Sequence, residues 1–200
     1  MAFDDGPFAR GDRFAPLAGV VYTTPGQVER LAIGRVRVDG LDATQALLRL
    51  WNVGDFAEGP RAILLDGVSV GGFNVLDLVG LHERTGRPVI SITRRPPRYP
   101  EIRSALRKYF PRSFRRRWAW VRARPLFRVT LSGAPRYVAV VGCRRAEALA
   151  LLERSTLRGA WPEPLRLARL LAHALPRPPP PSEARPGRKR PRPPAPAPNP

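Results

Sequence analysis

The chain has 200 residues, 43% of them hydrophobic, which is enough for one domain with a buried core. Its net charge of +19 and pI of about 11.7 favour a polyanionic partner, above all nucleic acid; attraction to anionic lipid and a codon bias towards arginine are the alternatives. A single cysteine, Cys143, excludes an intramolecular disulfide and a multi-cysteine zinc site, and we interpret it as a small core residue. Because there is no apolar run of membrane-spanning length and no signal-peptide pattern, a soluble, cytoplasmic protein is expected.

Strand and helix signals alternate along the chain. The predicted strands are 16–24, 30–40, 61–67, 87–95, 124–133 and 135–142, and the predicted helices are 42–53, 74–86, 100–110, 145–156 and 163–175. A strand, a helix and a strand follow one another between 61 and 95, so they should form a parallel, right-handed unit. Short turns make the early strands antiparallel. The sequence therefore predicts an α/β fold with a mixed sheet and helices on both faces.

The last 25 residues, 176–200, have a different composition from the rest. They contain twelve of the 25 prolines, six Lys/Arg and one acid, which gives a charge of +5. Proline lacks a backbone donor, so we predict a disordered basic tail after a domain formed by residues 1–175. The tail would raise affinity for nucleic acid without specificity, or have no defined role.

Aspartates stand beside glycines at three predicted strand ends. They are Asp4 and Asp5 in "FDDG", Asp39 and Asp42 in "VDGLD", and Asp66 in "LLDG". Ligands of open α/β sheets gather at the carboxyl ends of the strands, so these carboxylates converge if the strands are neighbours. Converging carboxylates repel unless they are protonated or bridged by a cation, and hard oxygen ligands suit Mg²⁺ or Mn²⁺.

Such a centre would activate water and stabilise a displacement at phosphorus, which makes a nuclease a sensible prediction for a basic protein. The alternative is that each Asp-Gly pair is a turn or a helix cap. His82 and His173 have no partner histidine at metal-binding spacing, and we interpret both as surface or structural residues.

Residues 94–128 form the most basic segment, with thirteen Lys/Arg and the single acid Glu101. Arginines alternate there with aromatic residues, so the segment could neutralise phosphates and stack on unpaired bases. In the alternative interpretation the rings belong to the core and arginine stems cover them. The predicted nucleic-acid-binding residues are Arg94, Arg95, Arg98, Arg115, Arg116, Arg117 and Trp118.

Six motifs follow one another along the chain: "DDGPF", "VDGLDAT", "ILLDG…GGFNVLDL", "TGRPVISITRRPP", "STLRG" and "PEPLRLARLLAHAL". Over residues 3–175 the chain resembles the archaeal endonuclease dU family (domain of unknown function family 99), which is related to endonuclease V. The resemblance implies a ribonuclease-H-like fold. It also implies metal-dependent cleavage of DNA near a deaminated base, with deoxyuridine the proposed lesion and DNA repair the role.

The resemblance also implies site residues. Carried over by motif, the catalytic set is Asp5 (or Asp4), Asp39 or Asp42, Asp66 and Glu163, with Asp5, Asp66 and Asp39 holding Mg²⁺ or Mn²⁺. A flipped base would need a pocket. Its expected wall is the glycine-rich loop after Asp66, with Gly67, Gly71, Gly72 and Asn74.

One feature departs from the family pattern. The family has a longer strand before "DDGPF", whereas three residues precede Asp4 here, so the first strand is expected to be truncated or the start codon wrongly assigned. Two other functions stay open: a non-catalytic nucleic-acid-binding protein that kept the fold, and an endonuclease that acts on inosine in RNA. Protein partners are not predicted.

Overall fold

The computed structural model describes residues 1–23, 26–52 and 59–176. The predicted basic tail therefore lies outside the described residues, apart from Pro176. Within the described part, no helix is both long and apolar enough to cross a membrane.

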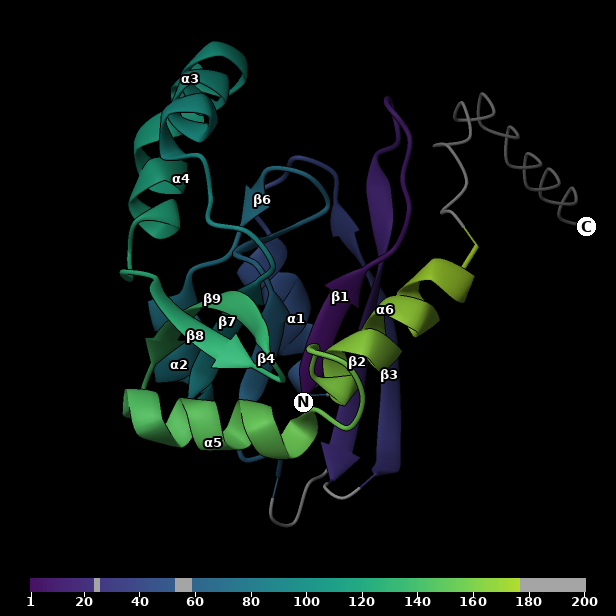
Figure 1. Ribbon diagram of the computed structural model, residues 1–200. Helices are drawn as coiled ribbons and strands as arrows, with labels where there is room; N and C mark the ends of the chain where they lie inside the picture. The colour runs from purple at the N-terminus through teal and green to yellow at the C-terminus, as the bar shows by residue number, and fades with distance from the viewer. Residues whose placement is uncertain (24–25, 53–58, 177–200) are drawn as a thin grey trace, which may run out of the picture.

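A mixed seven-stranded sheet, flanked by helices on both faces, forms the centre of the molecule (Figure 1). The strand order is β3-β2-β1-β4-β7-β9-β8, and β5 and β6 form a separate small hairpin. The strands are β1 (Ala2–Asp5), β2 (Phe14–Thr23), β3 (Gln27–Arg37), β4 (Ile63–Asp66), β5 (Ser69–Val70), β6 (Asn74–Val75), β7 (Val89–Thr93), β8 (Phe127–Leu131) and β9 (Ala134–Val141). The helices are α1 (Ala43–Trp51), α2 (Leu78–Thr85), α3 (Tyr99–Tyr109), α4 (Phe114–Val121), α5 (Arg145–Ser155) and α6 (Glu163–Ala174), with the 3₁₀ turn η1 (Pro111–Ser113) between α3 and α4.

The strand directions confirm the predicted topology. β4 and β7 are parallel and are joined through α2, as expected for a strand–helix–strand unit, and β1 to β3 form an antiparallel meander. β1 is also parallel to β4. The carboxyl ends of β1, β4 and β7 consequently lie at the same edge of the sheet, which is where an α/β sheet builds its sites.

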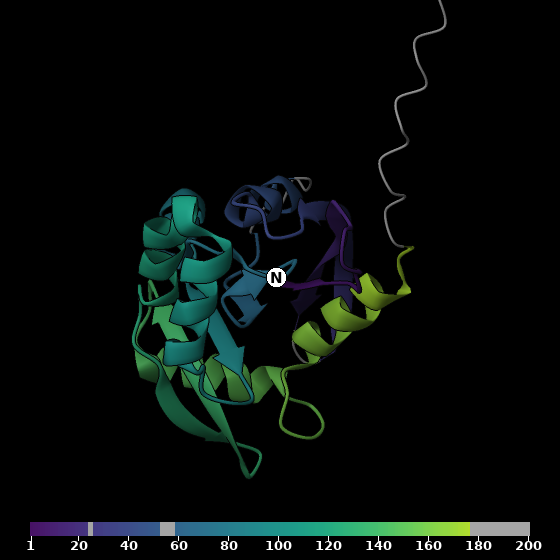
Figure 2. The ribbon, with the colours of Figure 1, turned by 90° about the horizontal axis from the view of Figure 1, so that it is seen from above.

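The first strand is present, although only three residues precede Asp4 and a truncated strand was expected. Residues 2–5 form β1, which lies in the middle of the sheet and pairs with β2 on one side and β4 on the other. Successive side chains of β1 point to opposite faces of the sheet. Ala2 packs among residues of α5 and α6, and Phe3 packs among residues of α1 and α2. Seen from above, α1 and α6 lie on opposite faces of the sheet (Figure 2). β1 therefore has the two-sided burial of a central strand.

The structure differs from the sequence prediction in two helices. The predicted helix 74–86 begins only at Leu78, because residues 69–75 form the β5–β6 hairpin and the Asp77 carboxylate accepts a hydrogen bond from the Gly80 N–H and caps α2. The segment 114–121, which was not predicted to be helical, forms α4. Its rings at Phe114 and Trp118 pack with Val121 against α3, and this burial outweighs the modest helix propensity of its aromatic residues.

Candidate functional site

Three carboxylates meet where β1 and β4 end. The register Ala2↔Leu64 places Asp4 beside Asp66 on the face covered by α5 and α6. Asp5, one residue along, is the last residue of β1, and the charge of Asp66 acts on its carboxylate. The Asp5 N–H donates to Asp4 Oδ1 (2.9 Å), and Asp5 Oδ2 accepts a hydrogen bond from the Gly71 N–H (3.0 Å). β1 and β4 are neighbours, which is the condition on which the predicted convergence of "DDG" and "LLDG" depends.

The acids disfavour one another's charge. Burial, followed by the charges of Asp66 and Asp5, raises the pKa of Asp4 to about 7. Burial also raises the pKa values of Asp5 and Asp66. This is the electrostatic situation that a bound divalent cation would relieve.

Positive groups from two elements offset part of this repulsion. Arg94, directly after β7, lies 3.7 Å from Asp66 Oδ2, and its charge lowers the pKa of Asp66. Arg169 and His173, four residues apart on α6, lower the pKa values of Asp4 and Asp5 respectively. The helix comes this close because Gly6 follows β1: a Cβ there would collide with the Ala172 carbonyl oxygen.

The sequence interpretation did not assign Arg169 a role, and it treated His173 as a surface or structural residue. Their i, i+4 spacing shows that they share one face of α6, but not that this face meets the carboxylates. Their place beside the site depends on the docking of α6 onto β1 and β2.

Asp39 lies at the rim of this cluster. It occupies the left-handed region (φ 54°), and its Oδ1 accepts a hydrogen bond from the Phe73 N–H (2.8 Å). The Asp39 N–H donates to the carbonyl of Gly71, the same residue whose N–H donates to Asp5. Gly72 leaves space for this turn, since a Cβ there would lie 2.5 Å from Asp39 Oδ1. The Asp39 carboxylate thus holds the loop against Asp5.

The side chains of Asp42 and Glu163 form hydrogen bonds and ion pairs outside the carboxylate cluster. Asp42 Oδ1 accepts hydrogen bonds from Asn74 Nδ2 and, at 3.3 Å, from the Arg37 N–H, so its side chain does not cap α1. Glu163 forms an ion pair with Arg166, one turn along α6. Neither residue joins the Asp4–Asp5–Asp66 cluster.

The resemblance implies a bound Mg²⁺ or Mn²⁺ ion, and the side chains at the site can be compared with the ligands that such an ion needs. Among the described residues, no group of three His, Cys, Asp or Glu side chains is gathered closely enough to hold a metal ion. Mg²⁺, however, commonly uses one or two carboxylates and completes its shell with water and substrate phosphate. Asp5 and Asp66, with raised pKa values and hard oxygen atoms, fit that partial set.

Arg117 differs from its predicted role in nucleic-acid binding. It is only 3% exposed, and its guanidinium donates to Ser113 Oγ and to the backbone carbonyl oxygens of Asp39, Gly40 and Phe73. It also stacks over the Phe110 ring at 4.3 Å. A buried guanidinium with these partners cannot contact a phosphate; it joins α4 to the two loops at the rim of the carboxylate cluster.

Of the other predicted nucleic-acid-binding residues, the arginines are exposed and Trp118 is half-buried. The exposed arginines of the set are Arg94, Arg95, Arg98, Arg115 and Arg116. Trp118 is half-buried between Tyr99 and Phe114, and the Arg122 guanidinium lies 5.8 Å from its ring centroid. This arrangement agrees with the alternative in which arginine stems cover core rings.

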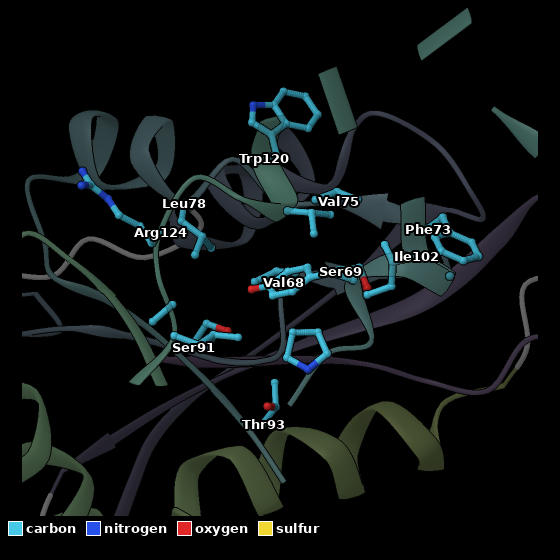
Figure 3. Close-up of a pocket in the computed structure, with 16 residues that line it drawn as sticks. Val68, Ser69, Phe73, Val75, Leu78, Ser91, Thr93, Ile102, Trp120 and Arg124 are labelled. Atoms are coloured by element: carbon cyan, nitrogen blue, oxygen red, sulfur yellow. The ribbon is translucent and has the colours of Figure 1, made fainter. Parts of the chain in front are cut away.

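A cavity of about 400 Å³ lies between the β5–β6 hairpin and helices α3 and α4, and Val68, two residues after Asp66, is part of its wall. Figure 3 shows Trp120 and Thr93 on opposite sides of it, with Val68 between them. Of the predicted pocket wall, Gly72 lines the cavity, whereas Gly67, Gly71 and Asn74 do not. Asn74 is fully buried and its amide joins the Arg37 carbonyl, Asp42 and the Ala43 N–H.

This fold matches solved structures of one class of nuclease. Endonuclease V from Ciona intestinalis, in complex with DNA containing an inosine followed by a ribo-adenosine, aligns with a TM-score of 0.57 and 15% identity over 84% of this chain and 81% of its own. Human endonuclease V gives 0.53 and 15% over 86% and 82%. The fold is therefore the ribonuclease-H-like fold of endonuclease V.

The chain belongs to the endonuclease dU family, whose model matches residues 1–176. A UPF0215 protein of Methanothermobacter thermautotrophicus is 37% identical over 86% of this chain and 84% of its own length, and one of Deinococcus radiodurans is 41% identical over 88% of each. A protein of unknown function from Archaeoglobus fulgidus has a solved structure with a TM-score of 0.74 and 33% identity, covering 86% of this chain and 94% of that one.

The raised pKa of Asp4 predicts how stability depends on pH. Between its ordinary value of 3.8 and its folded value of about 7, the folded protein binds more protons than the unfolded chain. Asp4 therefore contributes a stability that falls as pH rises from about 4 to about 7, by up to about 4 kcal/mol. The buried Met1 amino group acts in the opposite direction, because burial lowers its pKa to about 5 and its contribution rises with pH above that value. Urea titrations of wild type and Asp4→Asn at pH 5 and pH 8 in EDTA isolate the Asp4 contribution: Asp4→Asn should gain stability relative to wild type as pH rises, and an equal change in both proteins would contradict the prediction.

Proposed function

We propose that this protein is a metal-dependent endonuclease that acts on DNA containing a deaminated base, with deoxyuridine as the substrate and DNA repair as the role. The observation that carries the proposal is the meeting of Asp4, Asp5 and Asp66 at one sheet edge of a protein with net charge +19. The family and the likeness to endonuclease V support a nuclease-like function.

Mg²⁺ or Mn²⁺ would be held by Asp5 and Asp66, with Asp4 adjacent. When bound, such an ion supplies Lewis-acid stabilisation of charge on the phosphate and activation of water. Gly71 keeps the Asp5 carboxylate oriented through its N–H, and Asp39 keeps Gly71 in place. Arg94 and Arg169 balance the negative charge of the cluster and would attract the substrate phosphate.

The cavity between the β5–β6 hairpin and helices α3 and α4 would receive the extruded base. Its walls are mostly apolar and include Tyr99 and Trp120, which suit the faces of a base, and its volume falls in the range of small-molecule sites. Ser91 lines it and donates its hydroxyl proton to the carbonyl oxygen of Gly67, the residue after Asp66. Val68, two residues after Asp66, also lines the cavity, and this short separation along the chain supports placing the base there.

A side-by-side cleavage assay tests the proposal. Purified protein is incubated with uracil-containing DNA, inosine-containing DNA and inosine-containing RNA of one sequence, with Mg²⁺, with Mn²⁺ and with EDTA. We expect cleavage of the uracil DNA that requires the divalent ion. Binding without cleavage of any substrate would instead support the non-catalytic nucleic-acid-binding protein.

Preferential cleavage of the inosine substrates would support the second candidate, an inosine endonuclease acting on RNA. The observation that favours it is the solved Ciona intestinalis endonuclease V complex, whose DNA carries an inosine followed by a ribo-adenosine. The common assay separates the two candidates because the substrates differ only in base and sugar.

A further inference from the structure

A row of four charged side chains crosses the sheet on the face covered by α5 and α6. Asp4 and Asp66 stand side by side on β1 and β4. β7 and β9 are the next two strands of the sheet after β4. Thr93 of β7 pairs with Tyr137 of β9, so Arg94, directly after β7, lies opposite Arg136 of β9. Both follow the alternation of Ile92 and Val138, which are buried on that face. On this face, two carboxylates on β1 and β4 are therefore followed by two guanidinium groups at β7 and β9.

The guanidinium groups of Arg94 and Arg136 both pack on the ring of Trp161. The indole is 9% exposed, and it has the Cζ of Arg94 3.9 Å and the Cζ of Arg136 5.6 Å from its ring centroid. The Arg136 guanidinium is fixed further by donating from Nε to the Ala160 carbonyl (2.7 Å) and from Nη1 to the Pro135 carbonyl (2.6 Å). Its Nη2 has no hydrogen-bond acceptor among the described residues. A guanidinium held this way is preorganised and still has donors to offer.

Among the described residues, one ion pair, between Arg94 and Asp66, offsets the two positive charges of Arg94 and Arg136. Like charges on neighbouring strands repel. Burial, and then the charge of Arg94, lowers the pKa of Arg136. Among the described residues Arg136 forms no ion pair with a carboxylate, and Arg94 has only the 3.7 Å contact with Asp66. An anion between the two guanidinium groups would remove this repulsion.

We propose that Arg94 and Arg136, held on Trp161, form a subsite for a backbone phosphate of the nucleic acid, beside the phosphate at Asp66. The inference rests on the proposed function in taking the anion to be a nucleic-acid phosphate. β9 lies two strand spacings, about 10 Å, from β4, so the subsite reaches a phosphate within about three nucleotides of the one at the carboxylates. It fixes the position of the strand and reads no base.

The test measures binding without catalysis. A labelled single-stranded deoxyoligonucleotide is titrated in EDTA with wild-type protein, Arg136→Gln and the control Arg84→Gln over a range of salt concentrations. Arg84 is exposed near the carboxyl end of α2, which leads into the opposite end of β7, and its substitution removes the same charge. We expect Arg136→Gln to weaken binding about five- to tenfold and to reduce the salt slope by about 0.7, as loss of one phosphate contact does. Arg84→Gln should leave the slope unchanged.

A second arm locates the phosphate. Single methylphosphonate linkages, which lack the negative charge, are placed one by one along the oligonucleotide. Wild-type protein should lose affinity at one or two linkages, and Arg136→Gln should be insensitive at the same linkages. Arg136→Lys, which keeps the charge, should retain the salt slope; this variant and a circular dichroism spectrum separate loss of the contact from loss of folding.

The outcomes distinguish this inference from the proposed function. An unchanged salt slope in folded Arg136→Gln, an equal loss in Arg84→Gln, or no binding by the wild-type protein would overturn the subsite. Linkage-specific loss that depends on Arg136 supports it even if no substrate is ever cleaved. Cleavage of uracil DNA with an unchanged slope would leave the endonuclease and remove the subsite.

Discussion

Replacing Asp66 with Asn is expected to reduce metal-dependent cleavage of uracil-containing DNA by about a thousandfold. Asp66 ends β4 beside Asp4, and its charge adds to burial in raising the pKa values of both Asp4 and Asp5. The amide keeps the shape but removes the anionic oxygen that would hold Mg²⁺ or Mn²⁺. Stabilisation by such an ion amounts to several kcal/mol, and about 4 kcal/mol corresponds to three orders of magnitude in rate.

The same substitution should not unfold the protein. Burial raises the pKa of Asp66, which shows that the fold disfavours its charge, so a neutral side chain of equal size is tolerated. Single-turnover cleavage and urea unfolding are measured on one preparation. Glu83→Gln, an exposed acid on α2, is the matched control and should keep full activity. Unchanged cleavage by Asp66→Asn would remove the metal-site proposal.

Replacing Arg117 with Met should lower the free energy of unfolding by about 3–5 kcal/mol. The partly buried carbonyl oxygens of Asp39, Gly40 and Phe73 would lose their donor, and a group left unsatisfied in the interior costs about 1–3 kcal/mol. The cation contact with Phe110 would also be lost. Arg116→Met, an exposed neighbour in the same "RRR" run, should change stability by less than about 0.5 kcal/mol.

Guanidinium denaturation of the two variants measures this difference. A change of less than about 1 kcal/mol for Arg117→Met would show that the carbonyl oxygens find water or other donors. If the predicted loss is found, the α3–α4 segment is coupled to the Asp39 loop, and through Gly71 to Asp5. Arg117→Lys should recover part of the stability, since an ammonium cannot reproduce the planar fork of donors.

The "RRR" run shows why residue type does not predict role. Arg115, Arg116 and Arg117 look alike in the sequence, and all three were predicted to bind nucleic acid. The docking of α4 against β6 and Phe110 buries the third and leaves the first two exposed. The spacing of Phe114, Trp118 and Val121 did contain a helical signal, but it does not fix the rotation of the helix about its axis.

The sequence by itself determined the mixed sheet and the ends of its central strands. Alternation, chain order and strand–helix–strand succession are local properties, and they place Asp5 and Asp66 at the same edge. Only the tertiary structure decided which charges complete the site. Asp4 joins the cluster, Asp39 turns to the Phe73 N–H, and Glu163 pairs with Arg166. Arg94, Arg136 and Trp161 meet although the last lies 67 residues from the first in sequence. Such contacts depend on how α6 and the helices beyond β7 dock onto the sheet, and that docking is set by long-range packing which no short motif encodes.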